Sequence, residues 1–136
     1  MNILVIDGQG GRLGCQMVRS IAEKDPGARF MAVATNSAAA AAMAKAGAHQ
    51  AAAGENPLIV ACRKADIIIG PIGIVIADSL FGEITPAMAV AVAQSDAVRI
   101  LLPVNRCGNI VAGVQELSLT ALISDAMAKL EGVMQE

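Results

Sequence analysis

The chain has 136 residues, 55% of them hydrophobic, and a formal net charge of −2, a size at which a single domain buries about two thirds of its unfolded surface. It has no basic run and no Trp or Tyr for stacking on bases, which excludes nucleic-acid binding. The most apolar stretch, Ile67–Ala77, is shorter than the roughly 20 residues that span a bilayer, and Asp7 interrupts the apolar start. We therefore expect no membrane span and no signal peptide. The three cysteines are widely spaced and suit no disulfide framework, so we expect a cytoplasmic protein.

Candidate strands and helices alternate along the chain, separated by Gly, Pro and capping residues. Apolar and β-branched runs predict strands at Asn2–Ile6, Arg29–Ala34, His49–Ala53, Asp66–Gly70, Val98–Pro103 and Ile110–Val114. Helical spacing, alanine content and caps predict helices at Gly11–Lys24, Ala38–Ala46, Asn56–Lys64 and Pro86–Gln94, and a last helix that Ser118 caps. The glycine-containing stretch Gly70–Gly82 predicts a loop or irregular segment.

This alternation predicts an α/β fold. Near-continuous apolar strands separated by helices indicate a mostly parallel sheet covered on both faces. We expect one Rossmann-like, doubly wound domain over residues 1–136, with about five to six strands in three α/β/α layers. Ligands of such folds bind at the carboxyl ends of the strands, where the strand order reverses. The segments predicted at those ends are Asp7–Gly14, Thr35–Asn36, Gly70–Gly73 and Val104–Cys107.

Two features of the composition concern assembly and metal binding. The helix predicted at Pro86–Gln94 reads PAMAVAVAQ and has almost no polar face. We therefore expect it to be buried, between the subunits of a homo-oligomer. The three cysteines, Cys15, Cys62 and Cys107, are odd in number and widely spaced. They fit neither a disulfide framework nor a zinc pattern, so we expect reduced thiols and no metal site.

A glycine loop follows the first predicted strand and opens the first helix, reading IDGQGGRLG over Ile6–Gly14. The G-x-G-x-x-G fingerprint of dinucleotide sites fails at Leu13, but the spacing Gly8-x-x-Gly11-x-x-Gly14 fits a variant of it. Such a loop makes a tight turn, brings backbone N–H groups to a pyrophosphate and places the helix N-terminus beside it. The predicted cofactor-binding positions in this loop are Asp7, Gly8, Gly10, Gly11, Arg12, Leu13 and Gly14.

The stretch GQGGRLG resembles the G-x-x-G-R-M-G loop of the dihydrodipicolinate reductase family. This resemblance covers the first fifteen to twenty residues and implies NAD(P)H binding, with Gly8, Gly11, Arg12 and Gly14 around the pyrophosphate. That family carries its substrate and catalytic groups on a second domain, whereas we expect one domain here. Asp7 also stands where that family has a small residue.

A second resemblance covers the whole chain. The segments VIDGQGGRLG, ATN, AGA, GEN, DIIIGPIGI, GEITPAM and ILLPVNRC are similar to a family of short bacterial proteins described as a domain of unknown function. The resemblance implies a Rossmann-like fold and brings no activity with it.

The carboxylate at the mouth of the loop has two interpretations. Asp7 either accepts hydrogen bonds from backbone N–H groups of the loop, or binds a ribose hydroxyl, a metal or a substrate amine. A carboxylate beside a pyrophosphate is repulsive, which weighs against an ordinary NAD pose. A loop used only for close helix–sheet packing is the alternative to phosphate binding.

The cofactor is expected to be NAD or NADP, without a choice between them. NAD enzymes place Asp or Glu at the end of the second strand, about 20 residues past the loop. The equivalent stretch here, Thr35–Ser37, is uncharged and has no adjacent arginine for a 2′-phosphate. Asn36 is either a ribose ligand or only a helix cap.

Further candidates follow the fourth and fifth strands. Gly70 and Gly73 either let a ligand lie on the backbone or form a rigid turn. Asn105, Arg106 and Cys107 are possible substrate-binding residues, because arginine holds carboxylates and phosphates and a nearby cation activates a thiol. The alternative is a surface turn with a packing cysteine.

The remaining polar residues have structural explanations. Glu55 and Glu83 each precede a helix and are expected to be charges on its dipole. His49, the one histidine, is expected to be a surface or hydrogen-bonded residue.

Three hypotheses on function follow. The first is a minimal homo-oligomeric domain that oxidises or reduces a small substrate with NAD(P). The second is a sensor or accessory subunit that binds a nucleotide or phosphorylated metabolite without chemistry. A third hypothesis is an oligomeric scaffold whose glycine loop is only structural. The sequence has no Walker-type phosphate loop, no G-x-S-x-G elbow and no tyrosine. We therefore predict no particular reaction. The glycine loop predicts nucleotide binding at Gly8–Gly14.

Overall fold

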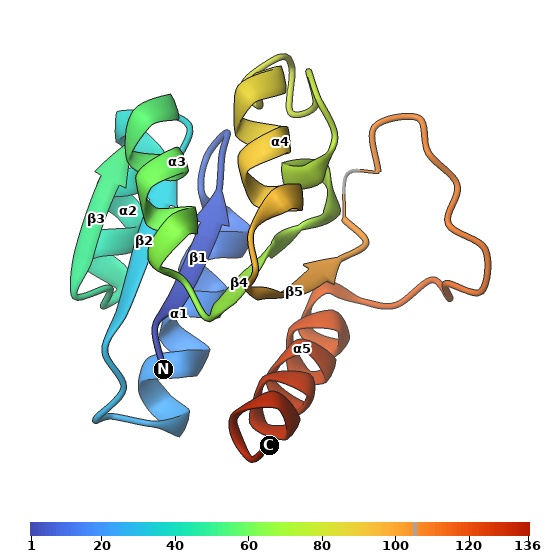
Figure 1. Cartoon of the computed structure of the whole chain (residues 1–136). Helices are drawn as coiled ribbons and strands as arrows, with labels where there is room; N and C mark the ends of the chain where they lie inside the picture. The colour runs from blue at the N-terminus through green and yellow to red at the C-terminus, as the bar shows by residue number, and fades with distance from the viewer. Residues whose placement is uncertain (105) are drawn as a thin grey trace.

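The computed structural model describes residues 1–104 and 106–136. A five-stranded parallel sheet forms its centre (Figure 1), with strand order β3-β2-β1-β4-β5. The strands are β1 (Ile3–Asp7), β2 (Phe30–Ala34), β3 (Gln50–Ala53), β4 (Ile67–Pro71) and β5 (Val98–Leu102). The helices are α1 (Arg12–Lys24), α2 (Ser37–Ala46), α3 (Glu55–Lys64), the 3-10 turn η1 (Ile72–Val75), α4 (Pro86–Gln94) and α5 (Leu119–Met134). The predicted Rossmann-like α/β fold is confirmed.

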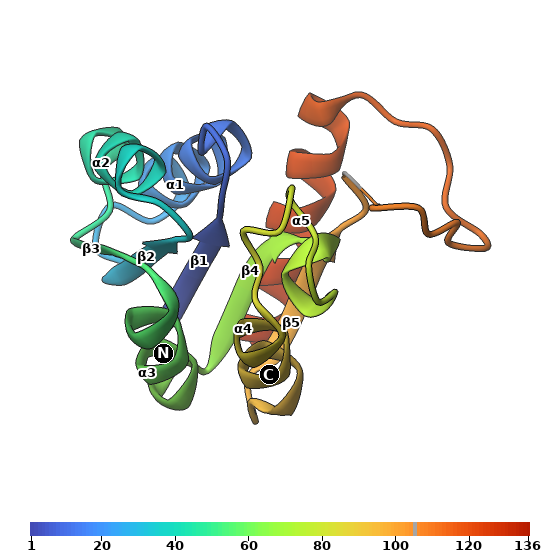
Figure 2. The same cartoon turned by 90° about the horizontal axis from the view of Figure 1, so that it is seen from above.

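Helices cover both faces of the sheet, which gives the three predicted layers (Figure 2). Side chains of β1 alternate between the two faces, as the pleat of a strand requires. Ile3 and Val5 pack with α1, α2 and α5, whereas Leu4 and Ile6 pack with α3 and α4. Burial on both faces explains why this strand is apolar from Ile3 to Ile6.

The predicted capping residues begin three helices. Asn36, Thr85 and Ser118 cap α2, α4 and α5, and each side-chain oxygen accepts the backbone N–H three residues further on, at 2.8, 3.1 and 3.1 Å. Pro86 occupies the first turn of α4, where its missing N–H does no harm. Local sequence therefore sets these boundaries.

The strand predicted at Ile110–Val114 is wrong. These residues form no strand, and Ile110 is 95% exposed. The sheet ends at β5, and residues 106–117 extend away from it as an irregular segment (Figures 1 and 2). An apolar run without a neighbouring strand to pair with does not become a strand.

The expectation that α4 is buried holds for only one of its faces. Met88, Ala89 and Val92 are buried, but Val90 on the outer face is 50% exposed. The segment between β4 and α4 is less irregular than predicted, because it begins with the 3-10 turn η1. Among the described residues, no helix is long and apolar enough to cross a membrane.

A close contact between the central strands demands glycine at position 70. A Cβ atom there would lie far inside van der Waals distance of the Ile6 carbonyl oxygen, and Ile6 belongs to the neighbouring strand. Backbone cannot move aside as a flexible side chain can.

We expect Gly70→Ala to lower the free energy of unfolding by about 1–3 kcal/mol or more, because it overpacks the centre of the sheet. Gly132→Ala is the control, since a Cβ there meets open space on α5 and should raise stability by about 0.5–1 kcal/mol. Urea unfolding measures both. Equal stability of the two variants would contradict the close contact.

Candidate functional site

The strand order reverses between β1 and β4, because the chain continues from β1 to β2 on one side and from β4 to β5 on the other. The carboxyl edge of the sheet has a hollow beside this switch point. This switch-point hollow has a volume of about 360 Å³, within the range of small-molecule pockets. It is lined by Gln9, Asp78, Ser79, Leu80, Phe81 and Cys107. These residues follow β1, β4 and β5, so the predicted convergence of strand ends brings Cys107 close to the glycine loop.

The lining of the switch-point hollow has an unusual backbone. Within residues 1–104 and 106–136, five non-glycine residues have positive φ, and all five line this hollow: Gln9 (50°), Asp78 (65°), Leu80 (55°), Phe81 (57°) and Cys107 (52°). Each such conformation costs on the order of 1–3 kcal/mol, and they cluster at binding and active sites. The Phe81 side chain is also 99% exposed. Strain and exposed apolar surface therefore coincide at the switch point.

Asp7 ends β1, and its side chain bonds the first turn of α1. Its Oδ2 accepts the Gly14 N–H at 2.7 Å, and the residue is only 6% exposed. Burial raises the pKa of Asp7 above its ordinary value of 3.8, and the nearby Glu83 charge raises it further, while backbone hydrogen bonds from Gly14 and Gly8 act in the opposite direction. Of the two interpretations from sequence, the structure has the one in which Asp7 bonds the loop backbone.

Two glycines of the loop are needed for close packing. A Cβ on Gly8 would lie 2.5 Å from Thr35 Oγ1, and a Cβ on Gly14 would lie 2.7 Å from Met43 Cε. The packing role considered for the loop is therefore real at these positions. It leaves the open side of the loop available.

That open side is formed by Gly10 and the start of α1. A Cβ on Gly10 would meet nothing within 4 Å, and Gly11 caps α1 with a φ of 74°. The N–H groups of Arg12 and Leu13 lie in the first turn, where helical N–H groups lack intrahelical acceptors. The Leu13 side chain is buried, whereas the Arg12 side chain is exposed and forms no hydrogen bond or ion pair with the residues that the structure describes.

Glu83 joins three loops through one oxygen atom. Its Oε1 accepts the Gln9 N–H at 2.9 Å, Asn36 Nδ2 at 2.9 Å and the Thr35 hydroxyl. Burial raises the pKa of Glu83, but these hydrogen bonds outweigh it and hold the pKa below its ordinary value of 4.5. The expectation that Glu83 only serves the dipole of α4 is wrong, because Thr85 caps that helix and Glu83 turns to the glycine loop.

Asn36 is committed to holding the loops together. Its Oδ1 caps α2, and its Nδ2 donates to the Gln9 carbonyl oxygen at 2.8 Å as well as to Glu83. The capping interpretation is thus confirmed. A ribose contact through Asn36 remains a prediction.

The residues predicted after β4 and β5 lie in different surroundings. Gly70 and Gly73 are buried, and the Gly73 carbonyl oxygen accepts the Ser79 hydroxyl. Arg106 pairs with Glu116, Nη2 to Oε1 at 3.1 Å, so its guanidinium is engaged on the surface. Asn105 lies outside the described residues.

Glu55 and His49, for which the sequence predicts only structural roles, have specific partners. Glu55 accepts a hydrogen bond from the Thr85 hydroxyl, which links α3 to the start of α4. His49 Nδ1 faces the Phe30 N–H at 3.5 Å, and its ring stands edge-on to the Phe30 ring. Neither lines the switch-point hollow.

No group of three His, Cys, Asp or Glu side chains among the described residues is arranged to hold a metal ion.

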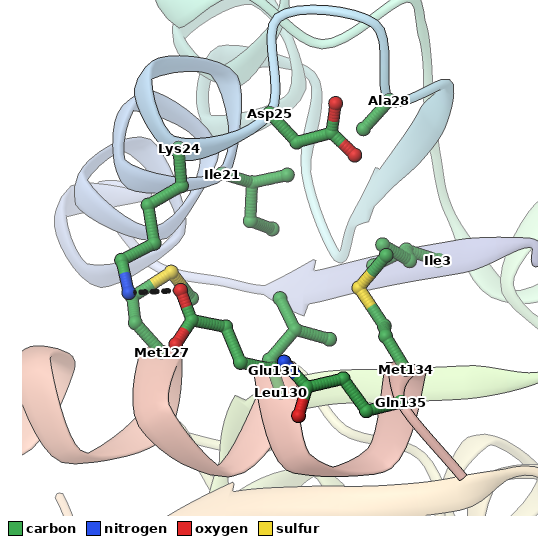
Figure 3. A pocket seen from close by; sticks show the side chains of 10 residues that line it. All are labelled: Ile3, Ile21, Lys24, Asp25, Ala28, Met127, Leu130, Glu131, Met134 and Gln135. Carbon is green, nitrogen blue, oxygen red and sulfur yellow. Dashed lines mark hydrogen bonds and ion pairs between the residues drawn. The ribbon is translucent and has the colours of Figure 1, made fainter.

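A second hollow, of about 300 Å³, lies at the opposite end of the sheet between α1 and α5 (Figure 3). Its apolar lining includes Ile21 and Leu130, and Lys24 and Glu131 form an ion pair across it. It sits by Ile3 at the amino end of β1. The general rule for open parallel sheets places ligands at the other end.

A family model for the domain of unknown function DUF3842 matches residues 2–135. The chain belongs to this family. No curated protein and no solved structure gives a significant match. Membership in the DUF3842 family agrees with the resemblance over the whole chain. The likeness of the glycine loop to dihydrodipicolinate reductases remains a prediction.

Asp7→Asn tests the buried carboxylate. The variant keeps an oxygen for the Gly14 N–H but removes the charge. Because the folded-state pKa of Asp7 is raised, the folded protein holds this proton more tightly than the unfolded chain. The contribution of Asp7 to stability is therefore full below its ordinary pKa and is lost as pH rises through the folded-state pKa.

We therefore expect the stability of Asp7→Asn, relative to the natural protein, to increase from about pH 4 to pH 7. Urea unfolding at several pH values measures this, with the exposed Asp96→Asn as the matched control. A difference between Asp7→Asn and the natural protein that does not vary with pH would contradict the buried charge.

Proposed function

We propose that this protein binds a nucleotide, an NAD(P)-type dinucleotide, across the carboxyl edge of the sheet at the switch point. The observation that carries the proposal is the switch-point hollow, where all five left-handed non-glycine residues of the described chain come together. Strain of this kind persists when the surrounding structure enforces it and is characteristic of binding sites.

The open side of the glycine loop suits the pyrophosphate. Gly10 leaves space for an approaching ligand, and the first-turn N–H groups of Arg12 and Leu13 lie at the positive end of α1. The Arg12 guanidinium adds a cation, which offsets the repulsion from Asp7. The Asp7 carboxylate is buried behind the loop on the Gly14 N–H, so it does not occupy the open side.

Binding is the part of the function that these contacts support. Asp78 and Cys107 are the ionisable side chains that line the switch-point hollow. A redox role would rest on the bound dinucleotide and a substrate. A sensor role would need only the binding.

Gly10→Glu should abolish dinucleotide binding while the fold is retained, because a carboxylate would enter the proposed phosphate position from a site with room for a side chain. Isothermal titration calorimetry with NAD⁺ and NADP⁺ measures the affinity, and the melting temperature reports the fold. Gly132→Glu, which adds the same charge in the open on α5, should bind normally. Unchanged binding by Gly10→Glu would refute the phosphate site.

We also propose that α4 mediates self-association of the chain. Its outer face carries Ala87, Val90 and Ala93, all exposed, and Val98 on the neighbouring edge strand β5 is exposed as well. A helix without a polar face gains stability when a second surface covers it. A second copy offers the same apolar face by symmetry.

Val90→Glu should shift the chain towards the monomer, because the new charge would be desolvated in the interface. Light scattering after size-exclusion chromatography gives the mass. Ala44→Glu, at an exposed position of α2, is the control and should leave the mass unchanged. A monomeric natural protein would remove the proposal.

A further inference from the structure

We propose that Glu83 is the carboxylate that recognises the adenosine ribose and makes the site select NAD over NADP. This inference rests on the proposed function. In NAD sites of this fold, an Asp or Glu at the end of the second strand accepts hydrogen bonds from the ribose hydroxyls. The end of β2 here has Thr35 and Asn36 instead. The structure brings a carboxylate to the same place from the segment between η1 and α4.

The three hydrogen bonds fix where this carboxylate lies. Thr35 and Asn36, at the end of β2, and Gln9, in the glycine loop, all donate to Glu83 Oε1. The carboxylate therefore stands where β2 meets the glycine loop. The ribose next to the pyrophosphate occupies this junction in a dinucleotide complex of this fold.

One oxygen of the carboxylate remains available. Oε2 accepts no hydrogen bond from any residue within 1–104 and 106–136, and Glu83 is only partly buried. A carboxylate offers about four acceptor positions over its two oxygens, and the three donors all meet Oε1. Oε2 is thus an oriented acceptor for the two ribose hydroxyls, held in place by bonds to the other oxygen.

Glycine at position 8 makes room for this carboxylate. A Cβ on Gly8 would lie 3.3 Å from Glu83 Oε1 and 3.0 Å from Leu80 Cδ1. Leu80 is one of the left-handed residues that bring the segment back over the loop. The tight glycine turn and the strained segment therefore serve the same placement.

Charge supplies the selectivity. The hydrogen bonds to Glu83 favour its ionised form, so the ribose position carries a negative charge at neutral pH. A 2′-hydroxyl donates to such an oxygen, whereas a 2′-phosphate is repelled by it. None of the described arginines or lysines forms an ion pair with Glu83.

The test compares two pairs of ligands that differ only in the 2′-phosphate. Calorimetry gives the dissociation constants of NAD⁺ and NADP⁺, and of adenosine 5′-monophosphate and adenosine 2′,5′-bisphosphate. The natural protein should prefer the ligand without the 2′-phosphate by about tenfold or more in each pair, as loss of a charged hydrogen bond implies. Glu83→Gln keeps an oxygen for the three donors and should bring the ratio close to one.

Glu23→Gln, at an exposed position of α1, is the matched control and should keep the preference of the natural protein. Binding of a dinucleotide with an unchanged preference in Glu83→Gln would overturn the role of Glu83 and leave the proposed function standing. A preference of the natural protein for NADP⁺ would overturn it too, whether or not the variant folds. If no nucleotide binds the natural protein, the proposed function itself fails, and this inference fails with it.

Discussion

The carboxyl edge of this domain depends on one acceptor, Oε1 of Glu83. It ties the loop after β1 to the loop after β2 and to the segment before α4. Each of these loops leaves a different strand. Glu83 Oε1 joins all of them with three donors, and the bond from Asn36 Nδ2 to the Gln9 carbonyl oxygen adds a second link between the first two. The left-handed residues that follow η1 bring the carboxylate there.

Two carboxylates lie near each other at this edge, and their pKa values are shifted in opposite directions. Asp7 is almost fully buried, and the loss of water outweighs its hydrogen bonds, so its pKa is raised. Glu83 is partly exposed and accepts three hydrogen bonds, so its pKa is lowered. The buried carboxylate accepts the Gly14 N–H in the first turn of α1, and the partly exposed one joins the loops around it. The surroundings of each carboxylate decide the direction in which its pKa is shifted.

Glycines in this fold act mainly through close approach. Gly8, Gly14 and Gly70 each stand where a methyl group would collide with a strand or with a side chain from another element. A fingerprint of glycines therefore reports helix–sheet packing as much as phosphate binding. Gly10 is the position of the loop where packing makes no demand, and it is the better probe of a ligand.

The sequence by itself determined the strand and helix order, the parallel sheet and the caps at Asn36, Thr85 and Ser118, because these follow from apolar periodicity and from bonds within four residues. It also placed the glycine loop at the correct end of β1. Only the tertiary structure decided that Ile110–Val114 forms no strand, that Asp7 faces the loop backbone and that Glu83 reaches Thr35 from 48 residues away. Pairing with a neighbouring strand and a hydrogen bond between distant loops depend on which surfaces meet after the chain folds. Local composition does not contain that information.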